Sequence, residues 1–521
     1  MSRKIRILSQ LSFFSIFTVF LLLLTRENLV QKLHVEWFLQ LNPLVTVLTS
    51  LASRSFIFHL SVFGLIVAVL TIILGRFFCG YICPLGALID FSDHFFIRKS
   101  RNNSRRPPIY LHRLKYVLLY IVLVCAIFGV LFPLFMDPIS LLTRIMTLCI
   151  APALSNLGSS GKSIWLTINN FLNKNGSVNN IQIIDPSYSF FAVFFLAIII
   201  AGGLWDRRFW CQYVCPSGAF FAFLSRFSIF RRQVSTSSCN NCRLCSTYQC
   251  PTRAIDFKNH SITSTSECLL CGLCSNNKRS CSRLVIAAPV KKETTGVDIH
   301  RRHLLAGITA GVITVPLLKT GIPSESLEPE LIRPPGSTPE PDFLSRCIAC
   351  GECMKVCPNH ALGPCGFLDG IGRIGTPKLI AQKGFCKDNC IACSNVCPTG
   401  ALFPVSAEDK PFVKVGTAIV DTSKCLSWRG IRRCMVCESV CPYNAITLEE
   451  VGLESEPKSG PMVNMDLCMG CGKCEKYCPV STNAAIHIIS DGERRIRPGI
   501  AVITRKRREK IIRLRQSRAD E

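Results

Sequence analysis

The first 235 residues alternate long apolar segments with polar, basic loops. Four of the segments approach the roughly 20 residues that a helix needs to cross the hydrocarbon core of a bilayer. They are Ile7–Leu24, Phe56–Leu74, Tyr116–Phe135 and Tyr188–Leu204. No small-x-small cleavage pattern follows the first, so we interpret it as an uncleaved anchor. The pattern predicts an α-helical membrane bundle over residues 1–235, with four transmembrane helices.

The basic residues of the loops predict which side of the membrane each loop occupies. Residues 94–115 carry seven Lys or Arg and no Asp or Glu, whereas the longer loop 136–188 carries three basic residues. Lys and Arg gather on the cytoplasmic side of membrane proteins, which places the N-terminus and loop 94–115 in the cytoplasm. The same bias explains much of the net charge of +26, so no nucleic-acid partner is expected.

One motif stands at the cytoplasmic end of two predicted helices, as RFFCGYICPLGA at 76–87 and as RFWCQYVCPSGA at 208–219. Its two cysteines are one helical turn apart and therefore face the same way. If the copies meet around a pseudo-twofold axis, four sulfurs converge, those of Cys79, Cys83, Cys211 and Cys215. They would hold a further metal centre or act as redox-active thiols, and the alternative is a structural packing repeat. A persistent disulfide is not expected on this reducing side.

Most of the 31 cysteines lie in Cys-x-x-Cys clusters, a pattern that favours iron–sulfur centres over disulfides. Residues 236–290 hold two such motifs and are predicted to fold as a two-cluster ferredoxin, in which the fourth cysteine of each motif binds the other cluster. The two expected ligand sets are Cys239, Cys242, Cys245 and Cys281, and Cys250, Cys268, Cys271 and Cys274. In the second motif Ser282 stands where a proline usually follows.

Residues 343–490 carry four further motifs that begin about 40 residues apart, an internal repeat that predicts a polyferredoxin domain. Each repeat is too short to bury a core of its own, so the clusters are expected to act as staples. The motifs are Cys347, Cys350, Cys353 and Cys357; Cys386, Cys390, Cys393 and Cys397; Cys425, Cys434, Cys437 and Cys441; and Cys468, Cys471, Cys474 and Cys478. Adjacent pairing and nested outer–inner pairing of the motifs both fit. With the first ferredoxin they predict six [4Fe-4S] clusters, in α+β folds like those of bacterial ferredoxins.

Three segments connect or follow these domains. Residues 298–320 contain the pair Arg301 and Arg302 before an apolar run, which is typical of a twin-arginine-type export signal and also of a fifth membrane anchor. Such a signal would suit a domain that receives its clusters in the cytoplasm and crosses the membrane folded. Residues 321–342 form a Pro-rich linker, and residues 491–521 form a basic tail.

The remaining candidates carry weaker signals. His59 lies inside the second predicted span, where it is either a proton acceptor for quinol or a histidine satisfied by a neighbouring helix. Residues 369–375 match Gly-x-Gly-x-x-Gly without a preceding strand, which indicates turn glycines. No Cys-x-x-Cys-His motif is present and the spans hold too few histidines for a bis-His haem, so neither haem, flavin nor NAD is expected. Three leftover cysteines are interpreted as buried or membrane-facing thiols: Cys125, Cys149 and Cys365.

This order of motifs resembles two known families joined in one chain. Residues 1–290 resemble the NapH/MauN-like membrane iron–sulfur proteins, and residues 298–490 resemble the NapG/MauM-like polyferredoxins. The resemblance implies a multi-pass protein of the inner membrane, with the first ferredoxin cytoplasmic and the polyferredoxin periplasmic. It also implies a quinol dehydrogenase that takes electrons from the quinone pool and passes them to a periplasmic cytochrome or to a reductase such as nitrate reductase. The alternatives are a redox maturation or regulatory factor for a metalloenzyme, and electron flow in the reverse direction.

Overall fold

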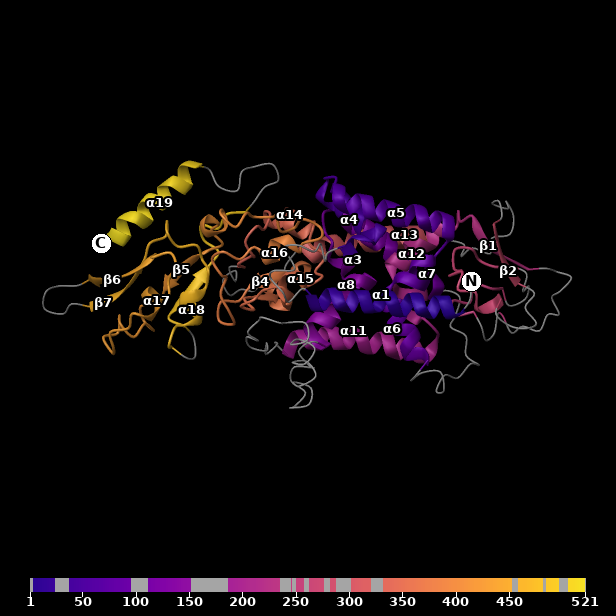
Figure 1. Ribbon diagram of the computed structural model, residues 1–521, viewed down its shortest axis with the longest axis horizontal. Coiled ribbons are helices and arrows are strands. Elements are labelled where there is room, and N and C mark those ends of the chain that lie inside the picture. Colours follow the sequence, from indigo (N-terminus) through magenta and orange to yellow (C-terminus); the bar gives the residue numbers. More distant parts are fainter. Residues whose placement is uncertain are drawn as a thin grey trace. The chain divides into compact units, whose positions relative to one another are not determined.

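The computed structural model divides the chain into two compact units, one that holds most of residues 1–319 and one that holds residues 320–521 together with residues 23–34. Figure 1 shows long helices in the first, N-terminal unit, and mostly short helices and strands, with the longer helix α19, in the second, C-terminal unit. The structure describes residues 3–23, 37–94, 111–150, 186–234, 245, 250–256, 262–275, 282–286, 301–319, 331–451, 458–480, 484–495 and 505–520.

The N-terminal unit is built mainly of helices. They are α1 (Arg3–Leu23), α3 (Trp37–Gln40), α4 (Pro43–Ser53), α5 (Phe58–Leu74), α6 (Pro84–Ser92), α7 (Leu111–Ile127), α8 (Pro138–Ile145), α11 (Pro186–Trp205), α12 (Pro216–Ser225) and α13 (Arg301–Lys319). The four predicted segments correspond to α1, α5, α7 and α11. Helix α7 ends at Ile127, earlier than predicted, because Gly129 adopts a positive φ of 79° that leaves the helical conformation.

Helix α4 was not predicted, because its 11 residues are too few to resemble a membrane span. Its local sequence nevertheless carries clear start and stop signals. The side chain of Asn42 caps the first turn, Pro43 occupies a first-turn position, and Arg54 ends the helix in the left-handed region. Most of its apolar side chains are buried, so α4 belongs to the interior of the unit.

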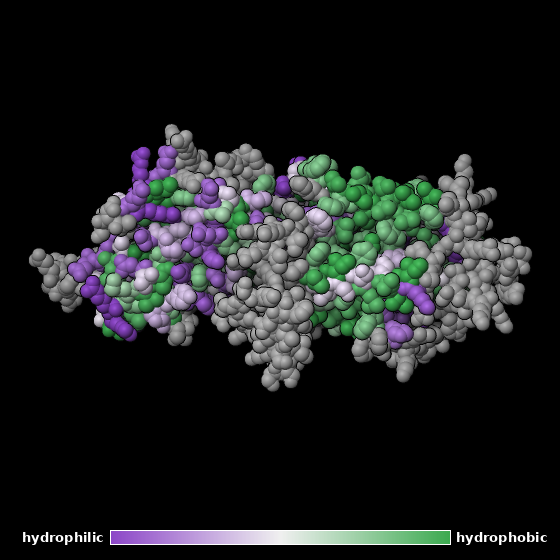
Figure 2. Space-filling model, viewed as in Figure 1, coloured by the Kyte–Doolittle hydropathy of each residue, from purple (hydrophilic) through white to green (hydrophobic). Residues whose placement is uncertain are grey.

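By length and composition, one stretch of the described helices is able to cross a membrane, Lys4–Leu21 within α1, and other apolar helices such as Leu60–Leu74 and Phe194–Trp205 are shorter. Figure 2 shows that the visible face of this helical unit is largely hydrophobic. Large apolar side chains are exposed on α1, α5 and α13, among them Leu8, Leu65, Ile66, Leu305, Ile313 and Leu317. An apolar surface of this extent requires a cover other than water.

Helix α13 packs closely on α7 through two glycines. A methyl group placed on Gly307 would stand 2.7 Å from the Cβ of Tyr120, and one on Gly311 would stand 2.7 Å from the Cβ of Val124. Glycines four residues apart allow two helices to approach this closely, as they do in membrane helix pairs. The segment that carries Arg301 and Arg302 is thus part of the helical packing of the N-terminal unit.

Two short strands close the first ferredoxin segment, β1 (Phe230–Val234) and β2 (Ser282–Ile286), which pair in antiparallel fashion. In the C-terminal unit three further antiparallel pairs form. They are β3 (Leu362–Pro364) with β4 (Pro377–Leu379), β5 (Thr417–Val420) with β8 (Ile486–Ile489), and β6 (Ile446–Val451) with β7 (Lys458–Val463).

Each of the four C-terminal motifs places its third cysteine on a helix of four residues. These helices are α15 (Glu352–Lys355), α16 (Ala392–Asn395), α17 (Val436–Ser439) and α18 (Lys473–Lys476); α14 (Glu340–Leu344) precedes them. The basic tail forms α19 (Arg505–Asp520), which buries Ile511 in the core of this unit. The guanidinium of Arg515 lies over the rings of Phe412 and Tyr443, so the tail helix is docked by one face.

Candidate iron–sulfur centres

The first two C-terminal motifs exchange their fourth cysteines. Cys397 lies close enough to Cys347, Cys350 and Cys353 for their charges to interact, and Cys357 lies in the same way beside Cys386 and Cys393. Site 1 therefore gathers Cys347, Cys350, Cys353 and Cys397, and site 2 gathers Cys357, Cys386, Cys390 and Cys393.

The third and fourth motifs make the same exchange. One small cavity is lined by Cys425, Cys434, Cys437 and Cys478, which we name site 3. A second is lined by Cys441, Cys468, Cys471 and Cys474, which we name site 4. The pairing that the sequence left open is thus adjacent, first motif with second and third with fourth.

The cysteine donors of these sites suit a cluster. Each fourth cysteine accepts a hydrogen bond from a backbone N–H a few residues later, for example from Ala361 to Cys357 at 3.3 Å and from Ala445 to Cys441 at 3.4 Å. Such bonds stabilise thiolate charge and tune the reduction potential of iron–sulfur centres. No group of three His, Cys, Asp or Glu side chains within the described residues is arranged to bind a single metal ion. A [4Fe-4S] cluster needs a different arrangement of ligands, because each of its four thiolates binds a separate iron atom.

Sites 2 and 4 adjoin one another. The backbone N–H of Cys386 donates a hydrogen bond to the carbonyl of Cys471 at 2.7 Å, which joins a ligand of site 2 to a ligand of site 4. Tyr443 is buried and its ring lies close to both cysteines. The two pairs of sites consequently form the order 1–2–4–3, with sites 2 and 4 at the centre.

Buried cations lie beside two of the sites. Lys410 is 3% exposed, and its ammonium group hydrogen-bonds the sulfur of Cys386 in site 2. Burial alone would lower the pKa of Lys410, but the neighbouring cysteine sulfurs raise it, so this group is positively charged. Near site 1, Arg333 is held by Glu340 at 2.6 Å and reaches the sulfur of Cys365 at 3.6 Å. A positive charge favours the electron-rich, reduced form of a nearby cluster.

The first ferredoxin has one site within the described residues. Cys250 lies beside Cys268, Cys271 and Cys274, which is the predicted ligand set with its crossed-over fourth cysteine, and we name it site 5. The backbone N–H of Ala254 donates to the Cys250 sulfur at 3.2 Å. Of the other predicted set, Cys239, Cys242 and Cys281 lie outside the described residues, and Cys245 lies within them.

The two copies of the repeated motif converge in the N-terminal unit. Cys79 and Cys211 each interact with the other and with both Cys83 and Cys215. In each copy a short π-helical turn, Phe78–Ile82 or Trp210–Val214, leads into a helix that begins at the proline. The four sulfurs, which we call the quartet, are thus brought together as the pseudo-twofold arrangement requires.

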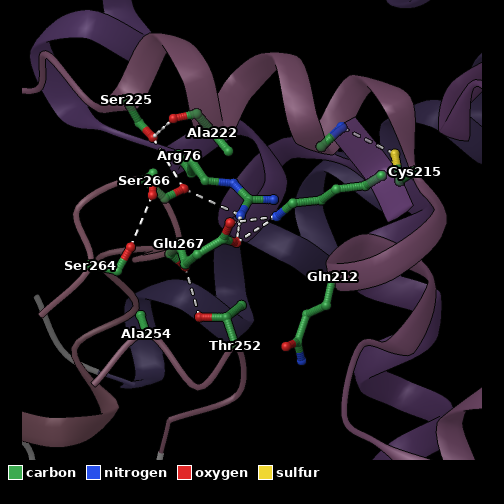
Figure 3. A network of polar contacts seen from close by, with 12 residues as sticks. Arg76, Gln212, Cys215, Ala222, Ser225, Thr252, Ala254, Ser264, Ser266 and Glu267 are labelled. Carbon is green, nitrogen blue, oxygen red and sulfur yellow. Dashed lines mark hydrogen bonds and ion pairs between the residues drawn. The ribbon is translucent and has the colours of Figure 1, made fainter. Parts of the chain in front are cut away.

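A buried network of charges joins the first copy to the first ferredoxin (Figure 3). Glu267, which precedes Cys268, accepts from Arg76 at 2.7 Å and from Lys115 at 2.6 Å. All three side chains are almost fully buried. Such a network holds the ferredoxin loop in place, because removing Glu267 would leave two positive charges buried without compensation.

The ferredoxin also contacts both copies of the repeated motif. In the first copy the hydroxyl of Tyr81 donates to the carbonyl of Leu270 at 2.9 Å. In the second, the amide of Gln212 donates to the carbonyl of Pro251 at 3.0 Å. Leu270 and Pro251 are neighbours of the site 5 ligands Cys271 and Cys250, so site 5 is seated against both copies.

A buried polar cluster near the quartet was not predicted from the sequence. The carboxylate of Asp137 accepts from the hydroxyl of Ser217 at 2.8 Å and from the amide of Asn42, and it also caps α8. Ser217 is the second residue after Cys215. The signal that would have revealed it is the recurrence of a polar residue before Pro43 and Pro138, each at a helix start.

Comparison with known proteins places the chain among iron–sulfur proteins. Residues 56–103 and 189–236 both match a 4Fe-4S binding domain, residues 343–363 match another 4Fe-4S binding domain, and residues 432–482 match a 4Fe-4S dicluster domain. The dicluster match covers all the cysteines of sites 3 and 4 except Cys425, in agreement with their pairing. No solved structure matches the chain.

Among curated proteins, the methylamine utilization ferredoxin-type protein MauM of Methylorubrum extorquens is 36% identical over 209 residues, which are 36% of this chain and 88% of MauM. The chain belongs to the MauM/NapG family of ferredoxin-type proteins. MauM of Paracoccus denitrificans is 36% identical over 182 residues, 33% of this chain and 76% of that protein. The ferredoxin-type protein NapG of Escherichia coli is 40% identical over 159 residues, 28% of this chain and 65% of NapG.

As a member of the MauM/NapG family, the protein is an iron–sulfur electron-transfer protein of ferredoxin type. Among the remaining candidates, the side chains of His59 and Cys149 lie outside the described part of the chain. Cys125 and Cys365 are fully buried. Residues 369–375 include the short 3₁₀ turn Ile371–Arg373 between two positive-φ glycines, Gly370 and Gly375, which agrees with turn glycines.

Proposed function

We propose that this MauM/NapG-family protein is a membrane-bound quinol dehydrogenase. It takes electrons from the quinone pool within its helical unit and passes them through [4Fe-4S] clusters to a periplasmic oxidoreductase. The observation that carries the proposal is the seating of site 5 on helices whose outer surface is apolar. A redox site that is fixed to a lipid-compatible surface suits a lipid-soluble electron donor.

The N-terminal unit plays the part of a NapH/MauN-like membrane protein in this proposal, fused to a NapG/MauM-like polyferredoxin. Helices α1, α5, α7 and α11 would cross the inner membrane, with the first ferredoxin on the cytoplasmic side. The close packing of Gly307 and Gly311 on α7 supports α13 as a retained fifth membrane helix. The C-terminal unit would then lie in the periplasm, next to its electron acceptor.

Transfer between the clusters needs no bond-making residue. Bound clusters would supply one-electron chemistry, and the protein holds them in sequence and sets their potentials through hydrogen bonds and charge. In the C-terminal unit electrons would follow the order 1–2–4–3 or its reverse, crossing between site 2 and site 4 at the Cys386–Cys471 hydrogen bond. Lys410, which contacts Cys386, would stabilise the reduced form of site 2.

The test is anaerobic reduction by quinol. The full-length protein, reconstituted in lipid vesicles, is mixed with menaquinol or ubiquinol, and cluster reduction is followed by electron paramagnetic resonance. We expect reduction that a quinone-site inhibitor blocks. Clusters that dithionite reduces but no quinol reduces would overturn the proposal.

Matched variants test the route. In Cys386→Ala site 2 loses a ligand, so we expect quinol to reduce either site 1 alone or sites 3 and 4 alone in the C-terminal unit. The control Cys365→Ala removes a buried cysteine that belongs to no site, and all four sites are expected to be reduced. Reduction of sites 1, 3 and 4 together in Cys386→Ala would contradict the proposed order.

A further inference from the structure

Neither copy of the repeated motif has enough cysteines to bind a [4Fe-4S] cluster by itself. Each copy lies in a segment that matches a 4Fe-4S binding domain, but each segment contains two cysteines, and a [4Fe-4S] cluster needs four thiolates. We propose that the two copies jointly bind a single [4Fe-4S] cluster through Cys79, Cys83, Cys211 and Cys215. This is a seventh centre, additional to the six clusters of the ferredoxin motifs.

The position of the sulfurs supports shared binding. Cys79, Cys83 and Cys215 are buried, with 9% or less of each residue exposed, and each copy's cysteines interact with those of the other. The backbone N–H of Gly218 donates to the sulfur of Cys215 at 3.2 Å. The ferredoxin sites show the same kind of backbone-to-sulfur bond at their Cys-Pro cysteines.

The two copies also reach across to each other. Arg76 begins the first copy, and its guanidinium lies 3.3 Å from where a Cβ on Gly218 of the second copy would stand. Arg208 begins the second copy, and its guanidinium lies 3.6 Å from the equivalent point on Gly86 of the first. A Cβ at Gly86 or Gly218 would stand 2.9 or 3.0 Å from the carbonyl of its own copy's Cys79 or Cys211, so the motif's Gly allows the close packing in which each copy meets the arginine of the other.

The charges around the quartet are positive in balance. Arg76 and Lys115 share a single carboxylate, Glu267, and Arg208 and Arg6 share a single carboxylate, Asp90. Each pair of cations therefore carries one positive charge more than its carboxylate neutralises, and the carboxyl of Asp137 contributes at most one negative charge. Both guanidiniums, those of Arg76 and Arg208, interact with Cys79 and Cys211.

Excess positive charge in a buried place is costly unless an anion accompanies it. Four neutral thiols supply no such anion. A [4Fe-4S] core in its 2+ state with four thiolates carries a net charge of about −2 and would supply it. Since site 5 is seated against both copies, through Tyr81 of the first and Gln212 of the second, the shared cluster is placed to exchange electrons with site 5.

Iron content tests the inference without any assay of quinol oxidation. The full-length protein and three variants are isolated anaerobically, and iron and acid-labile sulfide are measured per chain. The variants are Cys79→Ala with Cys83→Ala, Cys211→Ala with Cys215→Ala, and all four together. We expect each double variant to lose about four iron atoms and the quadruple variant to lose no more than either.

Other results would overturn the inference. Losses that add between the two double variants would mean one centre per copy, and unchanged iron would mean redox-active thiols or packing. The control Cys125→Ala removes a buried cysteine of the same unit and is expected to leave iron unchanged. If a variant loses more iron because it misfolds, the wild-type count decides: about 28 iron atoms supports a seventh cluster, and about 24 overturns it.

Discussion

The two units of the protein hold their cysteines in opposite ways. In the C-terminal unit each site is built from short local turns, with the third cysteine on a four-residue helix and one cysteine lent by the neighbouring motif. In the N-terminal unit short π-helical turns and the helix starts that follow them hold the quartet, and buried ion pairs such as Arg76–Glu267 fix the parts together. We expect the first arrangement to depend on the metal for its stability, and the second to depend on packing and side-chain charge.

Removal of iron should produce the largest difference in stability between the two units. One core cluster of the C-terminal unit contains Cys437, Cys468 and Cys474, and Cys441, Cys471 and Cys478 pack against it; all six belong to site 3 or site 4. Metal-binding free energy is folding free energy in such small domains, on the order of 10 kcal/mol for a structural metal site. We expect chelation under anaerobic conditions to abolish hydrogen-exchange protection in residues 343–490 and to preserve it in α5 and α7. Equal loss of protection in both units would contradict the comparison.

Loss of one buried carboxylate should act mainly on the N-terminal unit. Glu267→Gln leaves Arg76 and Lys115 buried without their shared counter-charge, at a cost of about 3–5 kcal/mol. We expect a clear fall in thermal stability of the detergent-solubilised protein, with iron at sites 1–4 retained. The control Glu450→Gln changes an exposed carboxylate in β6 and should have almost no effect. A Glu267→Gln protein as stable as the control would show that the network is dispensable.

The smallest expected effect is a change in the reduction potential of site 2. Lys410→Met removes the positive charge beside Cys386 but keeps an unbranched side chain of similar length. The reduced form of site 2 loses on the order of 1–2 kcal/mol of stabilisation, so its reduction potential should fall by several tens of mV. A redox titration followed by electron paramagnetic resonance measures this shift, with Lys410→Arg as the charge-preserving control. An unchanged potential in Lys410→Met would remove Lys410 from the tuning of site 2.

The cysteine spacing identified the cysteines that the structure brings together, including Cys250 beside Cys268, but it left the pairing of the four C-terminal motifs open. The order of the sites could not be predicted, because the contact between Cys386 and Cys471 depends on how separate repeats pack. The ion pair of Arg76 with Glu267 joins residues 191 positions apart, and no local pattern signals such a partner.

Some signals were present in the sequence but ambiguous. The Gly-x-x-x-Gly spacing of Gly307 and Gly311 indicates helix packing, but the arginine pair before it is equally typical of an export signal. The strong positive charge of the tail gave no sign of docking in the sequence, and its few apolar residues, Ile511 among them, pack it on the C-terminal core. For both segments, the sequence does not show which face of the helix packs against a neighbouring element, and this contact determines the role of the segment.

The loop between Cys425 and Cys434 has a practical consequence. Its backbone folds back on itself, with Arg429 bonded to Cys425 and the Ser427 hydroxyl accepting from the N–H of Cys434 at 2.8 Å. At its tip no atom lies within 4 Å of where a Cβ on Gly430 would stand. Because Gly430 has a positive φ of 71°, a spectroscopic label is better placed on the exposed neighbour Ile431, where it would report on site 3 from close range without replacing any of its sulfurs.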